Sequence, residues 1–298
     1  MKTHSSLRKG AYALGFALIS SLAHGVTVVD DGFETGTHPT GFRTVATGTG
    51  VAVHAVNTSN GTMSSPLAVD PAFAGGAGNR VLGVYGTANY PIIATLGGNA
   101  LLSTVSDSIT LSFDFRLTNT PLSAVGGFRF GLANSNGTLA NFDGSGSASD
   151  NDSGYYVTPG VSGSTPAANN YIFNEAGGTS PILAGLDRAA LTASAAGANI
   201  ADMNVHSVSL SLTRDSLTTI LISLTIDSTT WTATDSSANL RTSFDEIAFN
   251  NGFATTYAQY NLDNLKLTAT NFVPIPEPAF AGLVGIGVLS FLQRRRLG

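Results

Sequence analysis

The sequence of 298 residues contains no cysteine, which excludes disulfide bonds and a thiol nucleophile. Charged residues are also scarce, at 11% of the chain. Between residues 26 and 278 the only lysine is Lys266, and eight Lys and Arg stand against nineteen Asp and Glu, a formal net charge of −11. Such an acidic, lysine-poor region argues against binding to nucleic acid or to an anionic membrane surface. Its carboxylates could instead hold divalent cations.

Common catalytic signatures are absent from the same region. None of its three histidines, His38, His54 and His206, has the close spacing of metal ligands, and it contains neither a G-x-S-x-G motif nor a phosphate-binding glycine loop. Asp245 and Glu246 are adjacent acids in a strand-like segment. Their side chains would point to opposite faces and could not both reach one glycosidic bond without a β-bulge. We therefore expect a protein that is not an enzyme.

The N-terminus has the features of an export signal. A basic start precedes an apolar run over residues 11–23, and Ala23 and Gly25 supply the small residues that a signal peptidase reads. The run is short for a permanent membrane anchor. Residues 1–25 are therefore predicted to be a secretory signal peptide with a helical apolar part, cleaved by signal peptidase before Val26.

The C-terminus consists of three parts in a fixed order: a proline-rich motif, an uncharged apolar run and a basic cluster. These parts are Pro276, Glu277 and Pro278, then residues 279–292, then Arg294, Arg295 and Arg296. As a helix, the run would be about 21 Å long, which is shorter than a hydrocarbon core of roughly 30 Å. The arginines nevertheless fit the cytoplasmic end of a membrane segment, so we predict a short transmembrane helix here.

This order of parts resembles the PEP-CTERM sorting signal of Gram-negative, biofilm-forming bacteria. The resemblance covers residues 273–298 and implies that exosortase, an integral-membrane cysteine transpeptidase, recognises the motif and cleaves near it. It also implies an inner-membrane intermediate held by the C-terminal helix, which is followed by delivery to the cell surface or extracellular matrix.

Residues 26–272 are expected to form one β-rich domain. Apolar and polar side chains alternate along residues 109–117, and residues 208–212 and 220–226 repeat the pattern, as half-buried antiparallel strands do. Only Leu186–Ala196 is expected to form a helix within this region. The predicted fold class is all-β, an antiparallel β-sandwich of the jelly-roll type, flanked by the signal helix and the short C-terminal helix.

The two ends of this region resemble concanavalin-like and carbohydrate-binding-module jelly rolls. The region opens with D-G-F-E-T-G at residues 31–36 and closes with Y-N-L-D-N-L-K-L at residues 260–267. Residues 224–227, running on to Trp231, resemble the inner hairpin of these folds. The resemblance implies that the first and last strands lie side by side.

A structural calcium ion is predicted where these two ends meet. Apolar positions change parity at Asp263 and Asn264, which indicates a β-bulge that re-aims the Asp263 carboxylate. Together with Glu34 it would form an oxygen-rich site, and the resemblance implies such a calcium. The alternative is that Asp263 bonds only to backbone while Glu34 is solvated. A second acidic segment, residues 143–154, lacks EF-hand spacing and is expected to be a solvated loop.

Three aromatic residues are candidates for stacking on a sugar: Tyr155 and Tyr156, beside that loop, and Trp231, the single tryptophan. Packing in the core is the alternative for each. The expected function is that of an exported surface or matrix protein that binds extracellular polysaccharide, or has a structural role in a biofilm matrix, without catalysis. Two alternatives are a polysaccharide lyase or glycoside hydrolase with a concanavalin-like fold, and an architectural coat protein without a ligand.

Overall fold

The computed structural model of this chain is built from strands, and no helix occurs among the residues that it describes. No described segment could therefore cross a membrane as a helix. The described residues are 25–33, 42–45, 52–55, 67–73, 80–85, 92–118, 128–138, 151–159, 171–178, 183, 187–191, 200, 202–250 and 259–274. The predicted signal helix and C-terminal helix lie outside these ranges.

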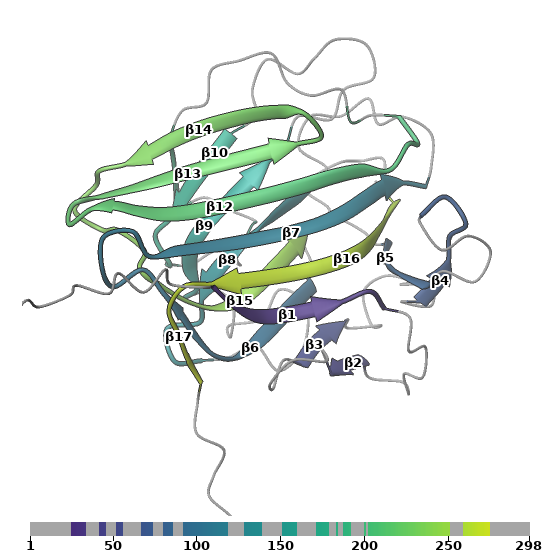
Figure 1. The fold of residues 1–298 in the computed structure, drawn as a ribbon, viewed down its shortest axis with the longest axis horizontal. Coiled ribbons are helices and arrows are strands. Elements are labelled where there is room, and N and C mark those ends of the chain that lie inside the picture. The colour runs from purple at the N-terminus through teal and green to yellow at the C-terminus, as the bar shows by residue number, and fades with distance from the viewer. Residues whose placement is uncertain are drawn as a thin grey trace, which may run out of the picture.

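The strands form two sheets, one of eight strands and one of nine, which lie one behind the other in Figure 1. The eight-stranded sheet runs in the order β14 (Thr229–Asp235), β13 (Thr219–Ile226), β12 (His206–Ser216), β7 (Ser108–Leu117), β16 (Gln259–Ala269), β5 (Arg80–Tyr85) and β4 (Leu67–Val69), with β1 (Val26–Asp31) also paired to β16.

The nine-stranded sheet runs in the order β11 (Arg188–Ala190), β10 (Tyr171–Glu175), β9 (Ser153–Thr158), β8 (Arg129–Asn134), β15 (Ser243–Asn250), β6 (Ile92–Leu101), β3 (Ala52–Ala55) and β2 (Phe42–Val45), with β17 (Phe272–Pro274) also paired to β6. Neighbouring strands are antiparallel in both sheets.

The core lies between the sheets because each strand turns alternate side chains inward. In β7 every second residue is buried from Ile109 to Leu117. The ring of Phe113 on this strand meets Phe130 of β8 at 5.0 Å and Phe249 of β15 at 5.2 Å between centroids, both edge-on. Each such ring contributes about 1.5–3 kcal/mol through burial. The predicted antiparallel β-sandwich is thereby confirmed.

The predicted meeting of the two ends is also confirmed. β1 pairs antiparallel with β16, with Val26 opposite Ala269. The register of β16 against β7 shifts between Asp263 and Lys266, and Asn264 has a φ of 52°. This irregularity is the expected β-bulge. The inner hairpin is present too, with Leu224 of β13 opposite Trp231 of β14.

The helix expected over Leu186–Ala196 is wrong in its described part. Arg188–Ala190 is strand β11, and it pairs antiparallel with β10. Leu and Ala have high intrinsic helix propensity, but a few residues gain more from the hydrogen bonds of an open sheet edge than from a helical turn of marginal stability.

Candidate functional site

A pocket of about 350 Å³ opens beside the end of β10, the edge strand β11 and residues 236–241, which belong to the connection from β14 to β15. Its polar lining consists of Asn174, Asp187, Arg188, Ser237, Asn239 and Arg241, and its apolar lining of Ala176, Ala189 and Leu191. The volume lies at the lower end of the range of about 300–1,000 Å³ that is usual for small-molecule sites. Convergent polar groups beside a small apolar surface are typical of a binding site.

Arg188 is held in place by two aromatic residues of the neighbouring strands. Its guanidinium carbon lies 4.5 Å from the centroid of the Phe173 ring. Its Nη1 donates a hydrogen bond to Tyr156 Oη at 2.8 Å. Burial raises the pKa of Tyr156 to about 12, although the Arg188 bond acts in the opposite direction. The phenol therefore stays protonated, and Arg188 is fixed by stacking and one bond rather than by an ion pair.

Asp235, at the end of β14, organises the opposite wall. Its carboxylate accepts hydrogen bonds from Tyr155 Oη at 2.7 Å, from Asn174 Nδ2 at 2.6 Å and from the backbone N–H of Ser237 at 2.8 Å. Burial alone would raise the pKa of Asp235, but these bonds hold it below its ordinary value. The carboxylate is therefore charged and ties three separate segments together.

Arg241 is joined to the same network. Its Nε donates to Asn174 Oδ1 at 3.2 Å, and its backbone N–H donates to Tyr155 Oη at 3.2 Å. Asn174 thus bonds to Asp235 through its nitrogen and to Arg241 through its oxygen. The guanidinium of Arg241 is consequently placed at the pocket by a rigid set of buried groups.

The structure places all three candidate aromatic residues inside the fold. Tyr155 and Tyr156 are each 1% exposed and Trp231 is 3% exposed. The two tyrosines point to opposite faces of β9, Tyr155 into the main core and Tyr156 into a smaller cluster with Phe173. The Tyr155 hydroxyl nevertheless reaches the pocket wall through Asp235 and Arg241, whereas the Tyr156 hydroxyl bonds to Arg188 on the other face. Tyr155 therefore lies behind the pocket and supports it.

Of the two residues predicted to bind calcium, Asp263 lies within the described part of the chain. Glu34 lies outside the described residues, so the pair stays a prediction. Asp263 is 2% exposed, and its Oδ1 accepts a hydrogen bond from the backbone N–H of Asn264 at 2.7 Å within the bulge. In the described part of the chain no three His, Asp or Glu residues are arranged to hold a metal ion.

A cluster of buried carboxyl groups lies on the outer face of the nine-stranded sheet. Glu246 and Glu175 stand in one row across β15, β8, β9 and β10, with only Ala133 and Gly154 between them. Asp152, directly before β9, lies against Glu246. The three acids are 0%, 1% and 1% exposed respectively. Of the acidic segment 143–154, the described residue Asp152 is thus buried rather than solvated.

Two acids of this cluster, Asp152 and Glu175, keep their protons to unusually high pH. Burial, followed by repulsion from Glu246, raises the pKa of Asp152 to about 9. Burial also raises the pKa of Glu175 to about 8, with Asp187 adding repulsion. Two neighbouring carboxyl groups cannot both ionise cheaply in such a site, so Asp152 stays protonated at neutral pH.

Asp245 and Glu246 do not follow the geometry expected of a regular strand. The register of β15 against β6 shifts between Phe244 and Glu246, so β15 contains a β-bulge at this point. The two side chains were expected to point to opposite faces only if no such bulge was present. Both carboxylates repel Asp152. Asp245 itself accepts hydrogen bonds from the backbone N–H and the Oγ of Ser135, both at 2.7 Å.

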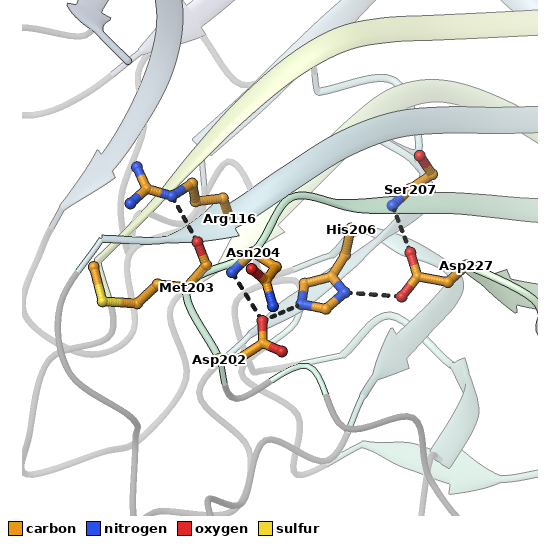
Figure 2. Close-up of polar contacts among 7 residues, drawn as sticks. All are labelled: Arg116, Asp202, Met203, Asn204, His206, Ser207 and Asp227. Carbon is orange, nitrogen blue, oxygen red and sulfur yellow. Dashed lines mark hydrogen bonds and ion pairs between the residues drawn. The ribbon is translucent and has the colours of Figure 1, made fainter. Parts of the chain in front are cut away.

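A second polar cluster surrounds His206, at the other end of β14 from Asp235 (Figure 2). His206 Nδ1 lies 2.8 Å from Asp227 Oδ2, and its Nε2 lies 2.9 Å from Asp202 Oδ1. Asp227, in the turn between β13 and β14, also accepts a bond from the Ser207 backbone N–H at 3.1 Å. The imidazole therefore connects this turn to the segment that leads into β12.

Replacing His206 with glutamine should lower the free energy of unfolding by about 1–2 kcal/mol, because one amide cannot bond to both partly exposed aspartates. Urea unfolding measures the loss. Asp215→Asn, at an exposed position near a turn, is the matched control and should change stability by less than about 0.5 kcal/mol. Equal stability of the His206 variant and the wild type would contradict this role.

No protein-family model matches the sequence, and no curated protein is significantly similar to it. Among solved structures, the metal-free form of lectin I-B4 from Griffonia simplicifolia is 12% identical with a TM-score of 0.39, over 63% of this chain and 87% of the lectin. The potassium-bound Emp46p carbohydrate recognition domain is 13% identical with a TM-score of 0.37, over 61% and 79%. A carbohydrate esterase from the Shiga toxin-encoding bacteriophage phi24B is 14% identical with a TM-score of 0.47, over 83% and 100%. At these values the similarities carry no information on what this chain binds. Any proposal about its ligand has to start from the residues of the chain itself.

Proposed function

We propose that this chain binds polysaccharide without cleaving it, through the pocket between β10, β11 and residues 236–241. The pocket is the observation on which the proposal depends. Sugar hydroxyl groups both donate and accept hydrogen bonds, and the side chains of Asn239 and Ser237 can do both as well. The C–H face of a sugar ring needs a small apolar surface, which Leu191 and Ala189 provide.

The proposed setting is the surface or extracellular matrix of a Gram-negative bacterium. The strand β17 carries the described fold to Pro274, immediately before the proline-rich sorting motif at residues 276–278. Signal peptidase and exosortase would act on segments that flank the sandwich at this end and at Val26. Because Val26 lies opposite Ala269, both processed ends would leave the same region of the sandwich. They would leave it from β1 and β17, neither of which lines the pocket.

The binding proposal is tested with purified full-length protein on an array of soluble polysaccharides. Asn239→Ala removes one polar group of the pocket whose side chain makes no hydrogen bond among the described residues. We expect binding that this substitution weakens about tenfold, which corresponds to one lost hydrogen bond of about 1.4 kcal/mol. A flat array for wild-type protein, with self-association in its place, would instead support the architectural role.

A polysaccharide lyase or glycoside hydrolase is the second candidate, and the bulge in β15 is what favours it. It brings the Asp245 and Glu246 carboxyl groups to the same neighbour, Asp152, and a raised carboxyl pKa suits a general acid. Against it, Glu246 and Asp152 are at most 1% exposed, so a polymer would have to displace what covers them. Release of reducing ends or unsaturated sugars, abolished by Glu246→Gln, would establish the enzyme.

A further inference from the structure

We propose that one end of the sandwich lies against the lipid bilayer while the C-terminal segment holds the chain in the membrane. This contact end is formed by four apolar residues: Val26, Val105, Leu217 and Val273. The inference concerns the chain before its release from the membrane. It depends on the predicted C-terminal membrane segment and not on what the pocket binds.

The first and last described strands bring two of these residues to the same end. Val26 lies opposite Ala269, the last residue of β16. Only residues 270–271 separate β16 from β17, in which Val273 pairs with β6 of the other sheet. The apolar residues next to the two predicted targeting segments are therefore neighbours in space, one in each sheet.

The other two contact residues reach this end from the middle of the eight-stranded sheet. β7 pairs with β12 so that Ser108 lies opposite Thr213, which places the start of β7 beside the end of β12. Val105 precedes that start, and Leu217 follows that end in the turn to β13. β7 also pairs with β16 at this end. Figure 1 shows the turn between β12 and β13, the starts of β1 and β7, and β17 at the left of the sandwich.

Exposed apolar side chains are concentrated here. The four contact residues, in chain order, are 48%, 48%, 74% and 50% exposed. In the described part of the chain, the other exposed large hydrophobic residues are Leu221 on β13 and Met203 at the opposite end, before β12. One exposed apolar side chain is ordinary, but four at the end that leads to an apolar segment indicate a contact with apolar surroundings.

The opposite end has the character of a surface that faces water. It carries Asp202 and Asp227, whose side chains are 43% and 48% exposed. Around Leu217 and Val105 the described charged residues are Arg214, Asp107 and Asp215, of which only Asp215 is exposed. A bilayer would therefore remove fewer charges from water at the contact end than at the opposite one.

The sequence beyond β17 leaves little distance between the contact end and the membrane. Residues 275–278 connect β17 to the apolar run at 279–292, and this connection could span only about 18 Å even when fully extended. The run itself, as a helix of about 21 Å, is shorter than a hydrocarbon core of about 30 Å. Such a mismatch draws the flanking residues toward the lipid headgroups, and the contact end would be drawn with them.

The test uses the absence of cysteine, because a single introduced thiol can then carry a fluorescent label. Thr218→Cys places the label beside Leu217, and Ser228→Cys places it in the turn at the other end of β13; both positions are exposed. Full-length protein is reconstituted into phosphatidylcholine nanodiscs that contain a lipid with a headgroup quencher. We expect quenching at position 218 to be at least about threefold stronger than at position 228, because β13 separates the labels by about 26 Å.

A second comparison tests the apolar side chains themselves. Combining Val105→Ser and Leu217→Ser with the label at position 218 should abolish most of the excess quenching, because serine gains nothing from leaving water. Leu221→Ser is the matched control, outside the contact end, and should leave the quenching unchanged. Raising the salt concentration should also leave it unchanged, because the contact is apolar.

The outcomes separate contact from tethering. Equal quenching at the two labelled positions overturns the proposal, because no fixed end of the sandwich would then face the bilayer. Stronger quenching at position 218 that both serine substitutions leave unchanged overturns it too, because the tether alone would hold this end near the lipid. Thermal unfolding checks that each variant is folded. If the double variant is not, Leu217→Ser alone should still lower the quenching. Neither failure affects polysaccharide binding, which the array measures separately.

Discussion

Replacing Asp152 with asparagine should stabilise the protein by about 2–4 kcal/mol at pH 7–8 and should have no stabilising effect near pH 3. In the folded state, burial and the neighbouring Glu246 raise the pKa of Asp152 to about 9, against an ordinary value of 3.8. Between these two values the folded protein retains a proton that the unfolded chain has lost. The stability of the wild type therefore falls as pH rises from about 4 to about 9.

Asparagine keeps the shape of the side chain and can still donate a hydrogen bond to Glu246, but it has no proton to lose. The gain should therefore grow with pH across this window, which urea unfolding at pH 3, 5, 7 and 8 would measure. Asp215→Asn at an exposed position should show no such trend. A variant that is less stable than the wild type at pH 8 would mean that Asp152 is ionised in the folded protein.

Replacing Gly154 with alanine should destabilise the protein by about 3 kcal/mol or more, which is the upper part of the range for overpacked cores. A Cβ atom at this position would lie 2.0 Å from the Leu132 carbonyl oxygen and 2.9 Å from the Ala133 Cα. Both atoms belong to the backbone of β8, which cannot move without breaking its pairing with β15.

Gly137→Ala provides the contrast. Its φ of +88° strains any L residue, but nothing lies within 4 Å of an added Cβ, so the cost should be about 1–2 kcal/mol. Urea unfolding of both variants distinguishes a lack of space from an unfavourable backbone conformation. Similar losses at the two positions would show that β8 and β9 can separate more easily than their contacts suggest.

Local patterns were enough to predict the sandwich. Alternation along β7 marks its buried face because successive residues of a strand point to opposite sides. The change of parity at Asp263 predicted the bulge for the same reason. Leu186–Ala196 was misjudged because its helix-forming composition carries no information about the open edge of β10, which lies elsewhere in the sequence.

The pocket could not be predicted in this way. Asn174, Ala189 and Arg241 come from three separate segments, and they meet only because β10 pairs with β11 while Asp235 bonds to Asn174 and to the connection after β14. The only nearby signal was the Tyr155–Tyr156 pair, whose rings are buried while the Tyr155 hydroxyl group supports the pocket wall. Likewise, Asp152 and Glu246 are brought together by sheet pairing and by a bulge that no sequence pattern marked.

The place of β16 in its sheet has a consequence for how the chain acquires its structure. β16 is the last long strand, yet it lies between β7 and β5 and also holds β1. A chain emerging N-terminus first therefore has two incomplete half-sheets and an unattached first strand until residues 259–269 arrive. Contacts so distant in sequence form slowly. The eight-stranded sheet can therefore be completed only after β16 has been made, so the joining of β1, β5 and β7 is a late step in folding.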